Sequence, residues 1–230
     1  MMEGIMSCLM IKEKICCRHE IMKKIKFLFD LDGTLTKEET LPILAEHFGI
    51  EDKISALTEY AVKGQVPFID SFIERVSYLS QFPVEEVAVL LKDVPLYERV
   101  VSFIHAHPTS CAIVTGNIGA WVARLVQRIG VEVFASKAQI QEGKIAHLSD
   151  ILAKETVVYR FQEAGYRVVF IGDGNNDFEA MQAADFSIAA GLTHEPATSL
   201  LAIADEIVYQ EKALVELLEA LYLGHEIKVN

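Results

Sequence analysis

Short apolar runs alternate with helical stretches over most of the chain. Four of these runs are typical of strands buried on both faces: residues 25–29, 111–114, 168–171 and 185–189. Amphipathic or polar stretches predict helices at residues 96–105, 156–164, 177–183 and 212–222, with a short strand near 206–209. Residues 134–147 predict a small hairpin that turns at Glu142, Gly143 and Lys144. The alternation predicts a doubly wound parallel sheet of the α/β class.

Between residues 37 and 93 the pattern changes to one helix after another. The first apolar stripe has the spacing i, i+3, i+4 and i+7: Leu41, Leu44, Ala45 and Phe48. Further helices are expected at residues 53–62, 68–79 and 84–91, with breaks at Gly64, Pro67 and Pro83. We expect residues 37–93 to form a small helical cap inserted into a core of residues 23–36 and 94–230. Closure of such a cap would exclude water from the site beneath it.

The first strand ends in two carboxylates two positions apart. Asp30 and Asp32 follow the apolar run 25–29, so they fall at the carboxyl edge of the sheet, where α/β proteins bind ligands. Gly33 allows the backbone to turn away without a Cβ clash. A strand that ends in an Asx turn would show the same residues, so this segment alone leaves both interpretations open.

Two further strand ends carry related chemistry. The run 168–171 ends in the sequence GDGNND, which contains Asp173 and Asp177. The run 111–114 ends in Thr115 and Gly116, a hydroxyl and a flexible backbone suited to an anion. Lys154 supplies a positive charge just before the expected helix 156–164. Together these residues favour a phosphate group and a hard divalent cation as ligands.

The four segments, in this order, resemble the motifs of the haloacid dehalogenase-like phosphohydrolase superfamily. The motifs correspond to Asp30 with Asp32, to Thr115, to Lys154, and to Asp173 with Asp177: DLD, TG, K and GDGNND. The resemblance implies a Rossmann-like α/β core and an enzyme that hydrolyses phosphate esters. It also implies that Asp30 attacks phosphorus to form an aspartyl-phosphate. Asp32 would protonate the leaving oxygen and later deprotonate the hydrolytic water.

The same resemblance implies the ligands of the cofactor and of the phosphate. Mg²⁺ would be held by Asp30, Asp173 and the backbone carbonyl of Asp32, with Asp177 supporting them from behind. The phosphoryl oxygens would be bound by residues of the second and third motifs, and a neighbouring amide would orient nearby groups: Thr115, Gly116, Lys154 and Asn176.

Two cap segments are similar to those of phosphoserine phosphatases. In that family a glutamate faces the substrate ammonium, an arginine binds its carboxylate and a phenylalanine shields the site. Glu39, Arg75 and Phe68 occupy the matching positions. The alternative is a surface Glu and a surface Arg on cap helices and a core Phe. Any one of the three residues alone would favour that alternative, whereas three at matching offsets favour phosphoserine. Asn117 departs from the family, which usually carries a second glycine there, and it adds a side chain close to the phosphate.

These residues predict a magnesium-dependent phosphatase, most specifically for O-phosphoserine. A phosphatase or phosphotransferase for another small phosphorylated metabolite is the alternative within the enzymes. A catalytically silent phosphate-binding module is a second alternative, but its signature would be the loss of Asp30 or Asp32, and both are present.

Composition narrows the class of partner. The 230 residues are 51% hydrophobic and carry a net charge of −12, which argues against a nucleic-acid partner. No apolar stretch approaches the roughly 20 residues of a membrane span, so we expect no membrane partner. We therefore expect a small phosphomonoester as the partner of a monomer or homodimer.

We expect residues 1–22 to form a flexible amino-terminal extension. Its apolar character is too weak for a signal peptide and no small-residue cleavage site follows its lysines, so we expect a cytoplasmic protein. Met22 is a natural alternative start immediately before the first strand. Cys8, Cys16 and Cys17 lie in this extension and Cys111 in the core, a distribution that predicts no disulfide framework.

Overall fold

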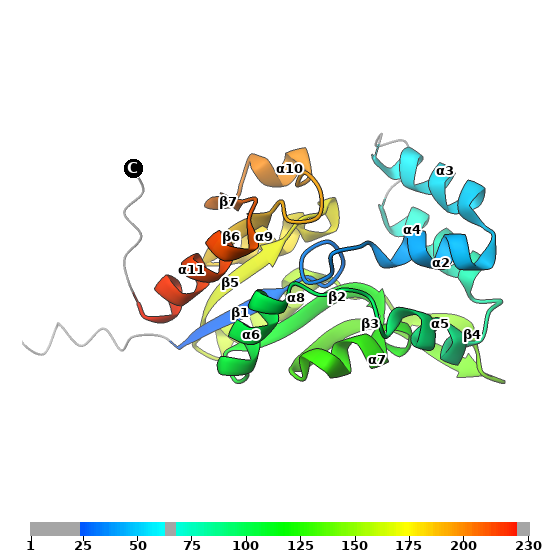
Figure 1. Cartoon of the computed structure of the whole chain (residues 1–230), viewed down its shortest axis with the longest axis horizontal. Coiled ribbons are helices and arrows are strands. Elements are labelled where there is room, and N and C mark those ends of the chain that lie inside the picture. The colour runs from blue at the N-terminus through cyan, green and yellow to red at the C-terminus, as the bar shows by residue number, and fades with distance from the viewer. Residues whose placement is uncertain (1–23, 63–67, 225–230) are drawn as a thin grey trace, which may run out of the picture.

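A computed structural model describes residues 24–62 and 68–224, and within them the side chains of all but residues 58–62 and 68. The predicted extension 1–22 and the predicted breaks at Gly64 and Pro67 lie outside these residues. Seven strands form a sheet in the order β4-β3-β2-β1-β5-β6-β7 (Figure 1). The strands are β1 (Ile25–Phe29), β2 (Cys111–Ile118), β3 (Glu132–Gln141), β4 (Lys144–Asp150), β5 (Arg167–Gly172), β6 (Phe186–Ala190) and β7 (Glu206–Val208). All neighbours are parallel except the antiparallel hairpin β3–β4, which confirms the predicted α/β class.

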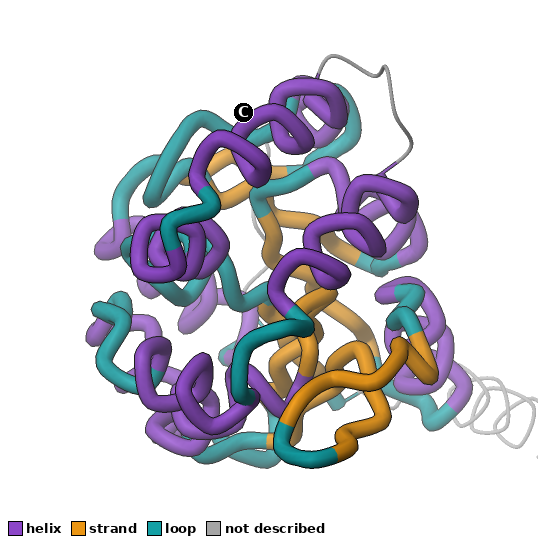
Figure 2. The backbone as a smooth tube through the Cα atoms, turned by 90° about the vertical axis from the view of Figure 1, so that its right-hand side faces the viewer, coloured by secondary structure: helices purple, strands orange, loops and turns teal. Residues whose placement is uncertain are grey.

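Helices cover both faces of the sheet, and Figure 2 shows the strands lying between them. One face packs against α6 (Glu98–Ala106), α7 (Gly119–Ile129) and α11 (Glu211–Tyr222); the other packs against α8 (Lys154–Glu163), α9 (Phe178–Ala183) and α10 (Thr198–Leu201). The alternation within β1 divides its side chains between these two layers. Phe27 and Phe29 enter the first and Leu28 the second, all fully buried. Burial of each such side chain contributes about 1.5–3 kcal/mol.

Four helices follow β1 in the segment predicted to be the cap. They are α2 (Thr40–Phe48), α3 (Glu51–Val62), α4 (Phe68–Leu79) and α5 (Val84–Leu91). In Figure 1, α2, α3 and α4 gather beside the carboxyl ends of the strands, whereas α5 lies alongside α7. Glu85 of α5 forms an ion pair with Arg124 of α7, and the Val84 amide donates to the Gly143 carbonyl at 2.8 Å. The predicted cap boundary at residue 93 remains a prediction.

Most differences from the predicted elements concern their ends. Helix α3 begins at Glu51 rather than at residue 53, because Glu51 and Asp52 suit the first turn of a helix. Lys154 begins α8 rather than preceding it, and a single 3₁₀ turn (Asn175–Asp177) precedes α9. Helix α10 was not predicted because its four residues are too few to show a period.

The order of the strands explains why one edge of the sheet holds the site. Strand β1 lies between β2 and β5, so the residues after these three strands meet at the point where the strand order reverses. Asp30 follows β1, Asp173 follows β5, and Thr115 lies in the carboxyl-terminal half of β2. In the described part of the chain, no helix is long and apolar enough to cross a membrane.

Candidate active site

The backbone after β1 turns sharply at a glycine. The Asp30 amide donates to the Ile171 carbonyl at 2.9 Å, which extends the β1–β5 pairing by one residue. Gly33 then adopts a φ of 74°, and a Cβ there would lie 2.5 Å from Asp173 Oδ2 and 2.8 Å from Glu39 Oε1. The turn therefore requires glycine both for its conformation and for the space that two carboxylates occupy.

Lys154 lies between two of the predicted carboxylates. Its Nζ is 2.7 Å from Asp30 Oδ1 and 2.6 Å from Asp177 Oδ1, and all three side chains are buried. Burial opposes the charge of Lys154, but Asp177 and Asp30 outweigh it and raise the lysine pKa above its ordinary value. Burial, together with Asp177, raises the pKa of Asp30, while Lys154 opposes that rise. A cation near Asp30 therefore favours the ionised form of this carboxylate.

A third carboxylate completes the cluster. Ligand oxygens of Asp30, Asp173 and Asp177 lie within 4.8 Å of one another, and Lys154 contacts two of these carboxylates, Asp30 and Asp177. Such an excess of buried oxygen ligands is compatible with a divalent cation. Asp177 already accepts hydrogen bonds from Lys154 and, at 3.1 Å, from the Asp173 and Gly174 amides. Asp173 accepts from the Thr34 hydroxyl at 2.6 Å, and burial raises its pKa to about 6.

Asp32 stands apart from this cluster in a different environment. Its Oδ1 accepts from the Thr40 amide and its Oδ2 from the Asn117 side chain, both at 3.2 Å. Burial and the charge of Glu39 raise the pKa of Asp32, and the hydrogen bonds from Thr40 and Asn117 oppose the rise. A carboxyl with a raised pKa suits proton transfer to a leaving group.

The predicted phosphate-binding residues divide into two groups. Thr115, Gly116 and Asn176 line a cavity of about 1360 Å³ together with Asp30 and Asp32. The Thr115 hydroxyl accepts from the Asn117 backbone amide at 3.0 Å. A Cβ at Gly116 would lie 3.9 Å from Asn176 Nδ2. Lys154 is buried and contacts Asp30, but it is not among the residues that line this cavity. Its predicted contact with the phosphate remains a prediction.

Two of the predicted cap residues face the same cavity. Glu39 and Arg75 both line it, and Arg75 is buried rather than on the surface. Arg75 Nε donates to the Ser71 carbonyl at 3.1 Å. Burial lowers the pKa of Arg75, and the charge of Glu39 opposes that shift. The side chain of Phe68 lies outside the described residues, so its shielding role remains a prediction.

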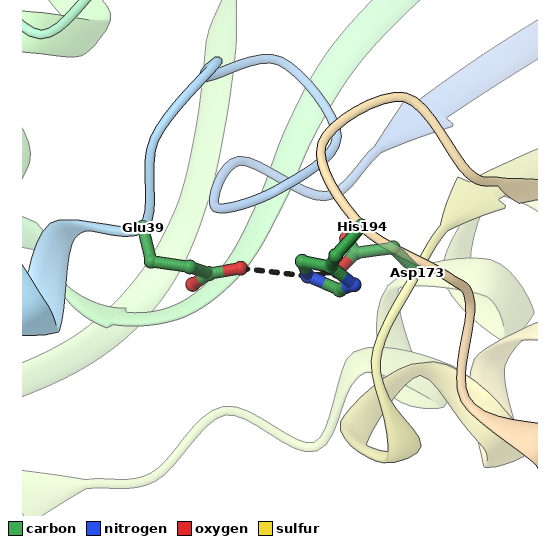
Figure 3. Close-up of side chains that lie close together, drawn as sticks. All are labelled: Glu39, Asp173 and His194. Atoms are coloured by element: carbon green, nitrogen blue, oxygen red, sulfur yellow. Dashed lines mark hydrogen bonds and ion pairs between the residues drawn. The ribbon is translucent and has the colours of Figure 1, made fainter. Parts of the chain in front are cut away.

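His194 is a site residue that the sequence did not indicate. It lies in the loop after β6 and points between Glu39 and Asp173 (Figure 3). Its Nε2 is 2.9 Å from Glu39 Oε1 and 3.0 Å from Asp173 Oδ2, and its Nδ1 is 3.0 Å from the Glu195 carbonyl. Because a carbonyl only accepts, both ring nitrogens face acceptors and the ring is an imidazolium. Hydrogen bonds to Asp173 and Glu39 raise the His194 pKa to about 11. The available signal was a histidine after a strand, at the same sheet edge as the aspartates.

Comparison with known proteins agrees with this arrangement. The model of the haloacid dehalogenase-like hydrolase family matches residues 27–182. A phosphoserine phosphatase of Methanocaldococcus jannaschii is 27% identical over 180 residues, which cover 73% of this chain and 85% of that protein. One of Idiomarina loihiensis is 28% identical over 201 residues, covering 81% and 89%. The matched segment spans only 52% of the phosphoserine phosphatase of Archaeoglobus fulgidus, also 27% identical.

Solved structures show the same fold. A substrate-bound phosphoserine phosphatase superposes with a TM-score of 0.70 at 24% identity, covering 87% of this chain and 98% of the other. A phosphoserine phosphatase from T. onnurineus gives a TM-score of 0.68 at 24% identity, covering 87% and 96%. The segment that matches the family model is more than half of the chain, and it contains the predicted site residues Asp30, Asp32, Thr115, Lys154 and Asp173. The chain belongs to the haloacid dehalogenase-like hydrolase family.

Proposed function

We propose that this protein is a magnesium-dependent phosphatase that hydrolyses a small phosphomonoester, O-phosphoserine first among them, through an aspartyl-phosphate. One observation carries the proposal: two carboxylates two residues apart lie in opposite environments beside one cavity. Asp30 is held by Lys154 within the acidic cluster, which suits a nucleophile. Asp32 accepts hydrogen bonds only from neutral donors, the Thr40 amide and the Asn117 side chain, so it can carry a proton, which suits an acid.

The chemistry follows from these two roles. A carboxylate oxygen of Asp30 attacks phosphorus, and the bond from phosphorus to the ester oxygen breaks. Asp32 gives its proton to that oxygen, and the alcohol leaves. Asp32 then takes a proton from a water molecule that attacks the phosphoenzyme, which releases phosphate and restores Asp30.

The acidic cluster fits a divalent cation, and we propose Mg²⁺. Asp30, Asp173 and the backbone carbonyl of Asp32 would bind it, while Asp177, already occupied by Lys154 and two amides, would support them. The cation would supply positive charge beside the phosphoryl oxygens, which the carboxylates would otherwise repel. Thr115, Gly116, Lys154 and Asn176 would bind or orient the same oxygens.

The cap side of the cavity supports an amino acid as the leaving group. Arg75 and Glu39 offer one cation and one anion within the same cavity as Asp32. Arg75 would bind the carboxylate of phosphoserine and Glu39 its ammonium, with Phe68 shielding the site. The names of several relatives at 25–28% identity support this substrate. It would place the enzyme in serine biosynthesis, and we propose a cytoplasmic monomer or homodimer.

One observation favours a second candidate. Glu39 already pairs with the His194 imidazolium at 2.9 Å, so the carboxylate meant for an ammonium has an internal partner. A small phosphorylated acid without an amino group, such as phosphoglycolate, would leave this pair intact and still meet Arg75. The ammonium of phosphoserine would have to share Glu39 with the His194 imidazolium.

A panel of phosphate monoesters tests both candidates. The purified protein is assayed for phosphate release from phosphoserine, phosphoglycolate and phosphoethanolamine, with Mg²⁺ and with a chelator. We expect the highest kcat/KM for phosphoserine and loss of activity with the chelator. Preference for phosphoglycolate would establish the second candidate. No release from any ester would contradict the phosphatase assignment.

A further inference from the structure

The side chain of Asn117 has all its polar hydrogens and its oxygen engaged. Its Nδ2 donates to Asp32 Oδ2 at 3.2 Å and to Thr40 Oγ1 at 3.0 Å, and its Oδ1 accepts from the Ile118 amide at 2.8 Å. A rotated amide would place its oxygen against the Asp32 carboxylate and its NH₂ group against the Ile118 N–H. These partners therefore determine both the orientation and the rotamer of Asn117.

Thr40 links this contact to the cap. It is the first residue of α2 and is buried, and its own amide donates to Asp32 Oδ1 at 3.2 Å. That amide is one of the N–H groups without a partner inside the helix, so Asp32 satisfies it. The Asp32 carboxylate is thus held on one oxygen by the end of β2 and on the other by the start of α2.

Two neutral donors suit a group that changes its protonation state. Each carboxyl oxygen has two lone pairs, so each can accept one hydrogen bond and still bind the proton that is given or taken. A lysine or arginine in place of Asn117 would put a positive charge beside Asp32. That charge would lower the pKa of Asp32 and favour the carboxylate over the protonated acid. An amide fixes the direction of the carboxyl without removing its proton.

We propose that Asn117 is a positioning residue for Asp32. It holds the carboxyl toward the leaving-group oxygen and, through Thr40, makes that orientation depend on helix α2. The inference rests on the proposed function, in which Asp32 is the acid. A simple structural link between β2 and the cap would instead affect all substrates alike.

The test uses two leaving groups. An alkyl phosphate, here phosphoserine or the best alkyl ester of the panel, needs a proton on its leaving oxygen. The nitrophenolate of p-nitrophenyl phosphate leaves without one. Since general acid catalysis contributes roughly 10²–10⁴-fold and misplacement of a group can cost about 10²-fold, Asn117→Ala should lower alkyl-ester kcat by about 10- to 100-fold. The pre-steady-state burst of nitrophenol, which reports the first step alone, should change less than about threefold.

Variants of Thr40 give an independent measurement. Thr40→Val removes the hydroxyl that accepts from Asn117, and it should lower alkyl-ester kcat in the same selective way by a smaller factor. Thr40→Ser restores the hydroxyl and should recover most of that loss. Asn117→Asp places a hydrogen-bond acceptor against Asp32 Oδ2, and its alkyl-ester kcat should fall at least as far as that of Asn117→Ala. Melting temperatures identify variants that do not fold. If Asn117→Ala is one of them, the comparison of Thr40→Val with Thr40→Ser tests the positioning role instead.

The outcomes separate the inference from the function. Suppose that the wild type is active and that Asn117→Ala lowers the alkyl-ester kcat and the nitrophenol burst by the same factor. This result would overturn the positioning role and leave the phosphatase assignment intact. Equal rates in Thr40→Val and Thr40→Ser would also overturn it. An inactive wild-type protein would overturn the function and the inference together.

Discussion

His194 and Glu39 form an ion pair of 2.9 Å between a core loop and the segment that leads into α2. The same ring nitrogen is 3.0 Å from Asp173, so one imidazolium joins two carboxylates that are proposed to bind different ligands. Mg²⁺ at Asp173 and an ammonium at Glu39 would both compete with this internal cation. Removal of His194 should therefore change the binding of each ligand.

Replacement of His194 should strengthen magnesium binding. His194→Gln removes a positive charge beside Asp173, and because partly exposed ion pairs are worth roughly 0.2–1 kcal/mol, we expect a Kd lower by about 1.5- to fivefold. Isothermal titration calorimetry of the protein without substrate measures this directly. His147→Gln, at an exposed position on β4, is the matched control. Weaker Mg²⁺ binding in His194→Gln would show that His194 supports the metal site.

The same pair should make the stability of the metal-free protein depend on pH. The His194 pKa is raised from 6.5 to about 11 on folding, so its stabilisation is fully present below pH 6.5 and is lost as pH rises toward 11. The melting temperature of the wild type in a chelator should exceed that of His194→Gln at pH 7, and the difference should shrink by pH 10. A difference that grows over this range would contradict the charged pairing.

Asp30→Asn should abolish turnover. An amide neither attacks phosphorus nor binds a cation as a carboxylate does, and we expect a loss of at least about 10³-fold in kcat for every ester hydrolysed. Phosphate release measures the rate, and mass spectrometry of the quenched wild type detects the phosphoenzyme. Asp93→Asn serves as control because its side chain is 83% exposed and does not line the cavity. Substantial activity in Asp30→Asn would refute the covalent mechanism.

Asp32→Asn should separate the two halves of the reaction. Without the acid, p-nitrophenyl phosphate can still transfer its phosphoryl group to Asp30, but the intermediate lacks the base that activates water. Stopped-flow absorbance should show a burst of nitrophenol followed by slow turnover. An unchanged steady-state rate would rule out the proton-transfer role.

Arg75 and Glu39 should discriminate among substrates by charge. Since a hydrogen bond to a charged group contributes about 1.5–3 kcal/mol, Arg75→Ala should lower kcat/KM for phosphoserine by about one to two orders of magnitude and affect phosphoethanolamine far less. Glu39→Ala should lower kcat/KM for phosphoserine and leave kcat/KM for phosphoglycolate nearly unchanged, because phosphoglycolate has no ammonium group. If all three substrates lose equally, these residues only stabilise the cap, and the substrate assignment falls while the phosphatase assignment stands.

The class of fold and the acidic strand ends could be predicted because both depend on local pattern. Strand β1 and helices α4 and α5 have the predicted bounds, since apolar period and proline breaks mark them within a few residues. Asp30 and Asp173 follow apolar strands that become neighbours, so topology alone brings them together.

The remaining contacts depend on distances along the chain that no local pattern records. His194 reaches Glu39 across 155 positions, and Asn117 reaches Asp32 across 85. Both side chains come from segments whose path is set by the packing of the whole sheet. Asn117 was noted as a departure from a family pattern, but its two hydrogen bonds to Asp32 and Thr40 could not be predicted from that departure.

Helix α5 shows which part of the insertion shares the stability of the core. Val87 and Leu91 of α5 are fully buried in the main apolar cluster, and Arg124 and Gly143 of the core contact the start of the helix. Separating α5 from α7 would expose this apolar surface to water. Helices α2, α3 and α4 instead pack mainly on one another, with α2 also contacting α5. Native-state hydrogen exchange should therefore group α5 with α7 in one cooperative unit, with α2 to α4 opening at a lower free energy.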